Sequence, residues 1–269
     1  MKTSTRKYTY PLNIEREYVY FLKRITKELR KNTLNNLDKI YEIVLKYRKL
    51  RHDSENDEIE EEIDEDIILP ILAILSAYVL KQELERLYNS VRSYITKDLE
   101  KEIHNALKKT AEETEVLARL KEAMFSLEDY KDEFIQDNEE LIEKLTNDYR
   151  NKLKQTIKNS IDFGYPKAML ADEIKKNLHT IDNRAELIGV DQIGRATGRL
   201  NQYFQQKMGC NRYIWQTMMD SRVRPAHRVR EGKIFEWKKP PYDGHPGMAI
   251  RCRCKAKPVF EIDWILCYN

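Results

Sequence analysis

Apolar residues recur with a helical period through the first 163 residues of this 269-residue chain. The clearest stripes, spaced mostly three or four residues apart, are Tyr18-Phe21-Leu22-Ile25-Leu29, Leu37-Ile40-Tyr41-Val44-Leu45, Val91-Ile95-Leu99-Ile103-Leu107 and Leu141-Leu145-Tyr149-Leu153. Such spacing gathers the apolar side chains on one face of an amphipathic helix. The pattern therefore predicts about five helices in residues 1–163, packed as an extended bundle or stalk.

The distribution of glycine indicates the same division of the chain. There are eight glycines, and the first is Gly164. Turns and hairpins usually need glycine where φ is positive, so a stretch of 163 residues without it favours helix. The sequence Phe163-Gly164-Tyr165-Pro166 breaks the pattern. Residues 164–183 are therefore predicted to be a connector, with a short helix near 168–178.

Helical spacing returns at residues 183–208, but Gly189, Gly194 and Gly198 interrupt it. We interpret these glycines as positions where another element packs closely against the helix. Beyond Gly209 the composition favours strands at 213–218, 233–237 and 252–259, with a loop at 240–244. The sequence thus predicts an α+β fold, in which a long, mainly helical N-terminal region precedes a small α+β module at 184–262 and a tail at 263–269.

Charge is distributed unevenly although the net charge is only +3. Residues 1–52 carry 14 Lys and Arg against 5 acids, residues 53–66 hold ten acids and no base, and residues 220–257 hold 11 bases against 4 acids. We interpret the acidic run as a solvated loop. The longest apolar run, 67–80, is too short for a membrane span and contains Pro70, so a buried helix is expected and no membrane partner.

The module at 184–262 concentrates the residues that can carry chemistry. All three tryptophans and all four cysteines lie beyond residue 209. A metal site is one interpretation, with Cys252, Cys254, His227 and His245 as ligands and zinc as the candidate ion. Cys-x-Cys is tighter than the usual zinc spacing, so simple burial of both thiols remains an alternative. If 252–254 is a strand, Arg253 is expected to point to the opposite, exposed face.

Catalysis is a weaker interpretation of the same residues. A cysteine nucleophile with His227 as base and Asp220 as orienting group, or a metal-dependent nuclease, would use these residue types, but nothing in the sequence fixes their geometry. We therefore expect no enzymatic activity, and we keep a nuclease or Cys-dependent hydrolase as the alternative.

A basic surface is a further interpretation of the module. Its candidate phosphate-binding residues are Arg222, Arg224, Arg228, Arg230, Lys238, Lys239, Arg251, Arg253, Lys255 and Lys257. Side chains of this kind bind DNA without sequence preference by neutralising phosphates. The competing hypothesis is that some of them form internal ion pairs with Asp220, Glu231 and Asp243.

An ordered series of motifs in the module resembles the phage Mu F-like minor head protein family, also called phage head morphogenesis proteins. The matching residues are Trp215, Asp220, Arg222, Arg224, His227, Gly232, His245, Pro246, Cys252 and Cys254. The resemblance covers roughly 184–260 and departs from the family pattern at Met219, Ser221 and Pro225.

The resemblance implies a minor protein of a tailed-phage or prophage head, and no catalytic activity. Its expected partners are the portal protein and the phage genomic DNA, with the scaffold or major capsid protein as further candidates. Its expected location is the head interior near the portal vertex, after assembly in the host cytoplasm. The implied roles are head morphogenesis and DNA packaging or delivery.

Overall fold

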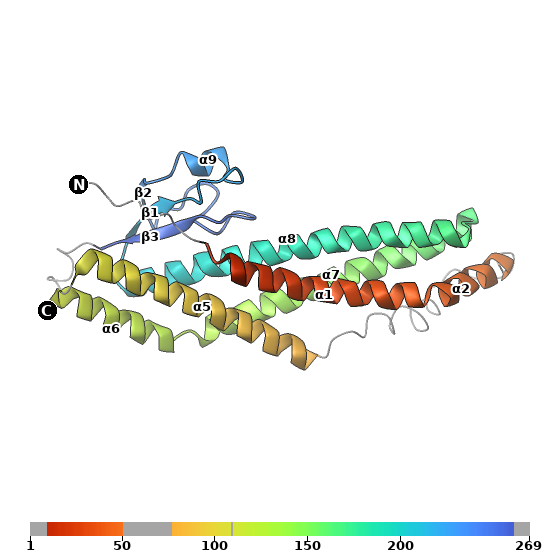
Figure 1. Ribbon diagram of the computed structural model, residues 1–269, viewed down its shortest axis with the longest axis horizontal. Coiled ribbons are helices and arrows are strands. Elements are labelled where there is room, and N and C mark those ends of the chain that lie inside the picture. The colour runs from red at the N-terminus through yellow and green to blue at the C-terminus, as the bar shows by residue number, and fades with distance from the viewer. Residues whose placement is uncertain (1–9, 51–76, 109, 261–269) are drawn as a thin grey trace. The chain divides into compact units, whose positions relative to one another are not determined.

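The computed structural model describes residues 10–50, 77–108 and 110–260 (Figure 1). The predicted acidic loop at 53–66 and Pro70 lie outside these residues. The described residues before 164 form α1 (Leu12–Asn35), α2 (Leu37–Leu50), α5 (Ala77–Leu107), α6 (Ala111–Phe125) and α7 (Glu128–Phe163). The helical character of the N-terminal region is therefore confirmed.

The helices before residue 164 end at residues other than glycine. Lys108 follows α5 with a positive φ of 27°, and Ser126 caps α6 by donating its backbone N–H to the carbonyl of Ala123. The first glycine, Gly164, has a φ of 71° and follows α7 directly. Gly164 therefore ends the helix as the sequence predicts, because a residue in the left-handed conformation commonly follows a helix.

α8 (Lys167–Lys207) is a single helix of 41 residues, and this differs from the two separate helices predicted at 168–178 and 183–208. The apolar period runs unbroken across the expected gap, through Leu170, Ile174, Leu178, Ile181 and Ala185, all buried. Neither glycine nor proline stands between residues 167 and 188 to end the helix. α8 therefore runs through the predicted connector.

The chain divides into two compact units, and each contains parts of several helices. Unit 1 comprises Met1–Arg16, Leu84–Gln136 and Val190–Asn269, and unit 2 comprises Glu17–Glu83 and Asp137–Gly189. None of the helices that the structure describes is long and apolar enough to cross a bilayer.

Unit 2 is a helical assembly with an apolar core and a few buried polar links. Tyr18 donates its hydroxyl hydrogen to Oδ1 of Asn138 at 2.5 Å, and both residues are buried. Thr33 and Tyr149 share a hydrogen bond of 2.6 Å between their hydroxyl groups. Because buried polar groups are costly when unpaired, these bonds favour one arrangement of α1 against α7.

Unit 1 contains a small antiparallel sheet formed by β1 (Arg212–Gln216), β2 (Ile234–Glu236) and β3 (Lys255–Val259). β1 lies in the middle, in the order β2-β1-β3. Trp215 is opposite Ala256, and Tyr213 is opposite both Phe235 and Pro258. Together with a short helix, α9 (Pro225–Arg228), this sheet confirms the small α+β module predicted from sequence.

The buried core of this module is aromatic and contains both thiols. Its members are Tyr213, Trp215, Trp237, Cys252, Cys254 and Ala256. The Tyr213 and Trp237 ring centroids are 4.3 Å apart, which is close packing for an aromatic pair. Two cysteines therefore lie next to the large aromatic side chains that β1 contributes to the core.

α8 packs directly against this module within unit 1 (Figure 1). Asn201 and Gln205 both donate side-chain amide hydrogens to the carbonyl oxygen of Ala256, each at 2.7 Å. A Cβ added to Gly194 would lie 2.7 Å from the carbonyl oxygen of Cys252, and one added to Gly198 would lie 2.5 Å from that of Pro246. The interpretation of these glycines as close-packing positions is thus confirmed.

Gly198→Ala should destabilise unit 1 by about 1–3 kcal/mol, because the new methyl group meets a backbone carbonyl that cannot rotate away. The usual gain of roughly 1 kcal/mol from replacing a helical glycine by alanine is too small to offset this. Urea denaturation followed by tryptophan fluorescence measures the change, since Trp215 and Trp237 lie in the core of the module in unit 1. A variant as stable as the parent would contradict the close approach.

Candidate functional site: a buried cluster of His227, Cys252 and Cys254

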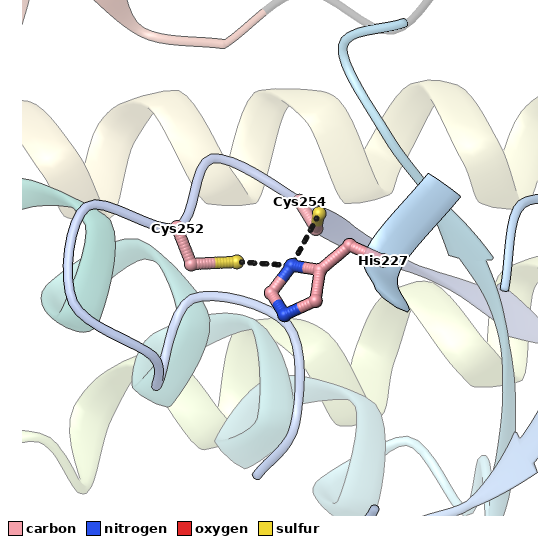
Figure 2. Close-up of side chains that lie close together, drawn as sticks. All are labelled: His227, Cys252 and Cys254. Atoms are coloured by element: carbon pink, nitrogen blue, oxygen red, sulfur yellow. Dashed lines mark hydrogen bonds between the residues drawn. The ribbon is translucent and has the colours of Figure 1, made fainter. Parts of the chain in front are cut away.

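Three side chains from two parts of the module converge at one point (Figure 2). His227 comes from α9, while Cys252 and Cys254 come from the extended segment just before β3. His227 Nδ1 lies 3.5 Å from the Sγ atom of each cysteine. The ligand atoms of all three residues lie within 4.8 Å of one another. The predicted convergence of these three residues is confirmed.

The other ring nitrogen of His227 is held by a carboxylate. His227 Nε2 lies 2.9 Å from Oδ2 of Asp243, and Arg230 Nη1 donates to Oδ1 of the same carboxylate at 2.6 Å. Burial raises the pKa of Asp243, but hydrogen bonds from Arg230 and His227 outweigh it and hold this pKa below its usual value. The carboxylate therefore fixes the orientation of the imidazole, with Nδ1 facing the sulfur atoms.

The two thiols share their environment and titrate as a pair. A hydrogen bond from Cys254, with further ones from His227 and the backbone N–H of Gly247, lowers the pKa of Cys252 against the effect of burial. The interaction with Cys252 raises the pKa of Cys254, and burial raises it further. The hydrogen bond to Cys252 also raises the pKa of His227, although burial opposes this.

The cluster is closed to solvent. His227 is 2% exposed, Cys252 is 3% exposed and Cys254 is 6% exposed. The ring of Trp215, itself fully buried, meets the imidazole edge-on with centroids 5.2 Å apart. A nucleophilic cysteine needs access for its substrate, so this burial favours a structural role for the cluster.

Asp220, the orienting group expected for a catalytic arrangement, lies elsewhere. It accepts hydrogen bonds from Arg253 Nη2 at 2.7 Å and 3.0 Å, and Arg228 Nη2 donates to its backbone carbonyl at 2.7 Å. Asp243 takes the position beside His227 instead. The sequence offers one signal for Asp243, since an acid in the Pro-Pro-Tyr-Asp-Gly loop is a candidate for pairing with a basic residue.

His245, the fourth candidate ligand, is buried but faces a different partner. Its Nδ1 lies 2.9 Å from the hydroxyl oxygen of Tyr213, and its ring packs edge-on against Trp237. Burial lowers its pKa. His245 therefore belongs to the aromatic core and does not join the group formed by His227 and the two cysteines.

The sequence predicts Arg253 as the exposed residue between the two cysteines, and this prediction is wrong. Arg253 is 7% exposed and forms an ion pair with Asp220. The segment at 252–254 is packed on both sides, because α8 approaches the backbone of Cys252 at Gly194. Side chains do alternate along an extended segment, but the side to which Arg253 points is covered by the protein and not by solvent.

The ten candidate phosphate-binding residues fall into two sets. Arg230, Arg253 and Lys255 are buried, each in an ion pair, and the half-buried Lys257 pairs with Glu102 at 3.5 Å. The exposed set is Arg222, Arg224, Arg228, Lys238, Lys239 and Arg251. The hypothesis of internal ion pairs is thus confirmed for Asp220 and Asp243, while Glu231 instead accepts a hydrogen bond from the backbone of Thr217.

The remaining motif residues shape the loops that carry the cluster. The backbone N–H of Arg222 donates to Asp220 Oδ1, and Arg224 Nη2 donates to the carbonyl of Ile250. Gly232 adopts a φ of 72° in the turn before β2, a conformation that side chains disfavour. Pro246 is buried, and its carbonyl faces Gly198 of α8.

Comparison with known proteins finds a family model and a relative that each match part of this chain. Residues 151–257 match the model of the family described as "Phage Mu protein F like protein". A Haemophilus influenzae protein described as "Uncharacterized protein" is 33% identical over 125 residues. That alignment covers 46% of this chain and 28% of the relative, so the similarity spans less than a third of that protein's length. No solved structure matches the chain.

Proposed function

Because residues 151–257 match the phage Mu protein F-like family, we propose that this chain is a minor head protein of a tailed phage or prophage. Its proposed role is head morphogenesis at the portal vertex, together with DNA packaging or delivery. The family match is the observation that carries the proposal. It extends upstream of the motif series at 184–260 and includes the whole of α8.

The burial of the His227 cluster supports a structural role over an enzymatic one. A Cys-dependent hydrolase remains the alternative because Cys252, His227 and Asp243 follow one another at 3.5 Å and 2.9 Å, the series that a thiol nucleophile uses. All three cluster residues are less than a tenth exposed, however, and Trp215 packs against the imidazole.

The role in the head can be tested with particles from the phage or prophage that encodes the chain. Mass spectrometry of purified, DNA-filled heads should detect it at low copy relative to the major capsid protein. Deleting its gene should leave aberrant or empty heads in electron micrographs, and expression in trans should restore filled ones. Normal yields of infectious particles after deletion would contradict the proposal.

The proposed DNA contact uses the six exposed basic residues of the module. They lie in or beside the loops at 220–251, and none has a side chain buried among the core residues. Four of them have nearby acceptors in the same loops, including Asp220, Glu236 and the carbonyl of Ile250. Exposed pairs of this kind are weak, so phosphates can compete for the same cations.

Binding to duplex DNA should show no sequence preference and should weaken steeply with salt, because counterion release drives it. The double variant Lys238→Gln, Lys239→Gln should reduce the slope of log K against log salt by about 2. The matched control is Lys175→Gln, Lys176→Gln, which removes the same charge from two exposed, ion-paired lysines of unit 2. Fluorescence anisotropy at several salt concentrations measures both.

Two outcomes would contradict this contact. The parent protein showing no binding at low salt would remove DNA from its proposed partners. Equal losses in the two double variants would mean that the module has no special part in binding, and that net charge alone accounts for it.

A further inference from the structure

We propose that His227, Cys252 and Cys254 bind a zinc ion that joins α9 to the segment before β3. Two thiolates and an imidazole form a ligand set typical of zinc in proteins. They come from places 25 and 27 residues apart along the chain. The site lies entirely within unit 1.

The spacing of the three donors fits a tetrahedral zinc ion. With Zn–S bonds of about 2.3 Å and a Zn–N bond of about 2.0–2.1 Å, tetrahedral geometry places a nitrogen about 3.6 Å from each sulfur. His227 Nδ1 lies 3.5 Å from both sulfur atoms. Both nitrogen-to-sulfur distances therefore match a tetrahedral site, and all three donor atoms lie within 4.8 Å of one another.

The neighbours of the donors match the surroundings expected of a metal site. A ligating histidine usually gives its other N–H to a carboxylate, which directs the free nitrogen at the metal. His227 Nε2 and Asp243 make such a pair at 2.9 Å, and Arg230 fixes the carboxylate from its other side. The backbone N–H of Gly247 lies 3.4 Å from Cys252 Sγ and can donate to a thiolate.

The loops around the cluster contain little regular structure, and a bound zinc ion would stabilise them. Between Thr217 and Cys254 the described chain contains only α9 and β2, which span four and three residues. Many backbone hydrogen bonds of these loops are local turns, such as Val223 to Asp220 and Cys252 to Ala249. A structural zinc ion contributes its binding free energy directly to folding, and small modules with short elements commonly depend on one.

His245 does not belong to this ligand set, so replacing it serves as a control for the proposed zinc site. Its Nδ1 faces the hydroxyl group of Tyr213. The three donors supply three of the four positions of a tetrahedral zinc site. Cys210 provides a second control, because it is another buried cysteine of unit 1 and does not belong to the cluster.

Elemental analysis of the full chain, purified from zinc-supplemented cells, tests the site. We expect about one zinc ion per chain in the parent, in Cys210→Ser and in His245→Asn. We expect less than about a tenth of that in Cys252→Ser, Cys254→Ser and His227→Asn, because each removes one donor. Full zinc content in the Cys252→Ser variant would overturn the proposal.

The parent protein supplies a test that does not depend on the folding of any variant. A strong chelator should lower its melting temperature by more than about 5 °C, and added zinc should restore it. Cobalt added to the chelated chain should give thiolate-to-metal charge-transfer absorption. A chain that holds no metal as purified, melts at the same temperature with chelator or zinc, and gives no cobalt spectrum would show that the two thiols are simply buried.

Discussion

Replacing Lys255 by methionine should lower the free energy of unfolding of unit 1 by about 2–3 kcal/mol, although the side chain is similar in length and more apolar. The Lys255 side chain is only 5% exposed, and its ammonium group pairs with the carboxylates of Asp98 and Glu102 on α5. Removing it leaves the partly buried carboxylate of Asp98 without this cation, and leaves Glu102 with the longer pair to Lys257. Because the side chains of Asp98 and Glu102 are 24% and 19% exposed, water limits the loss below that of a fully buried pair.

Lys257→Met is the matched control for this variant. It removes the same charge two residues along β3, but from a side chain that is 36% exposed and whose pair with Glu102 spans 3.5 Å. Its cost should be below about 1 kcal/mol. Urea denaturation followed by tryptophan fluorescence compares the two, and adding Asp98→Asn and Glu102→Gln to Lys255→Met should recover most of the loss. Equal effects of the two lysine variants would show that the buried pair contributes nothing specific.

The helical part of the fold can be predicted from sequence because its signals are local. Apolar spacing and the absence of glycine before residue 164 identify helices without reference to the rest of the chain. The same signals in residues 167–188 favour one continuous helix. The prediction nevertheless divides this region into two helices, at 168–178 and 183–208, and the glycines of the second weaken its helical pattern. Glycine weakens an isolated helix, but the close approach of Cys252 and Pro246 gives Gly194 and Gly198 a packing role inside α8.

The candidate site is predictable in its members but not in its surroundings. Residue chemistry groups His227, His245, Cys252 and Cys254, because imidazole and thiolate ligands suit the same metal ion. The fold brings three of them together and leaves His245 beside Tyr213. The roles of Asp243, His245 and Arg253 depend on which elements cover the segment before β3. That covering comes from α8 and the 240–247 loop, and it is a long-range arrangement that no local pattern specifies.

The basic residues of the module show the same limit of prediction from sequence. The ten basic residues of the module look alike in sequence, and each could face DNA. In the structure, three are buried in ion pairs, because acids brought close by the fold, such as Asp98 of α5 and Asp220, compete for them. A sequence can show how many cations a module has, whereas the fold decides which of them remain at the surface.

Trp215→Ala should cost unit 1 about 3–5 kcal/mol, the loss expected for removing a large, fully buried aromatic side chain. Trp215 lies in β1, the central strand, and its ring meets Phe235 and His227 edge-on with centroids 5.6 Å and 5.2 Å apart. The guanidinium group of Arg230 lies 4.8 Å from the same ring. The cavity left by alanine would therefore remove support from the sheet and from the imidazole of the cluster.

Tyr242→Ala is the control for that variant. Tyr242 is 86% exposed, and its contact with Arg230, 5.3 Å from ring centroid to guanidinium carbon, resembles the one that Trp215 makes. Its removal should cost no more than about 1 kcal/mol, the value of an exposed cation–π contact. Urea denaturation followed by circular dichroism compares the two without relying on the deleted tryptophan. A Trp215→Ala variant that loses no more stability than Tyr242→Ala would mean that this ring is not the centre of the module's core.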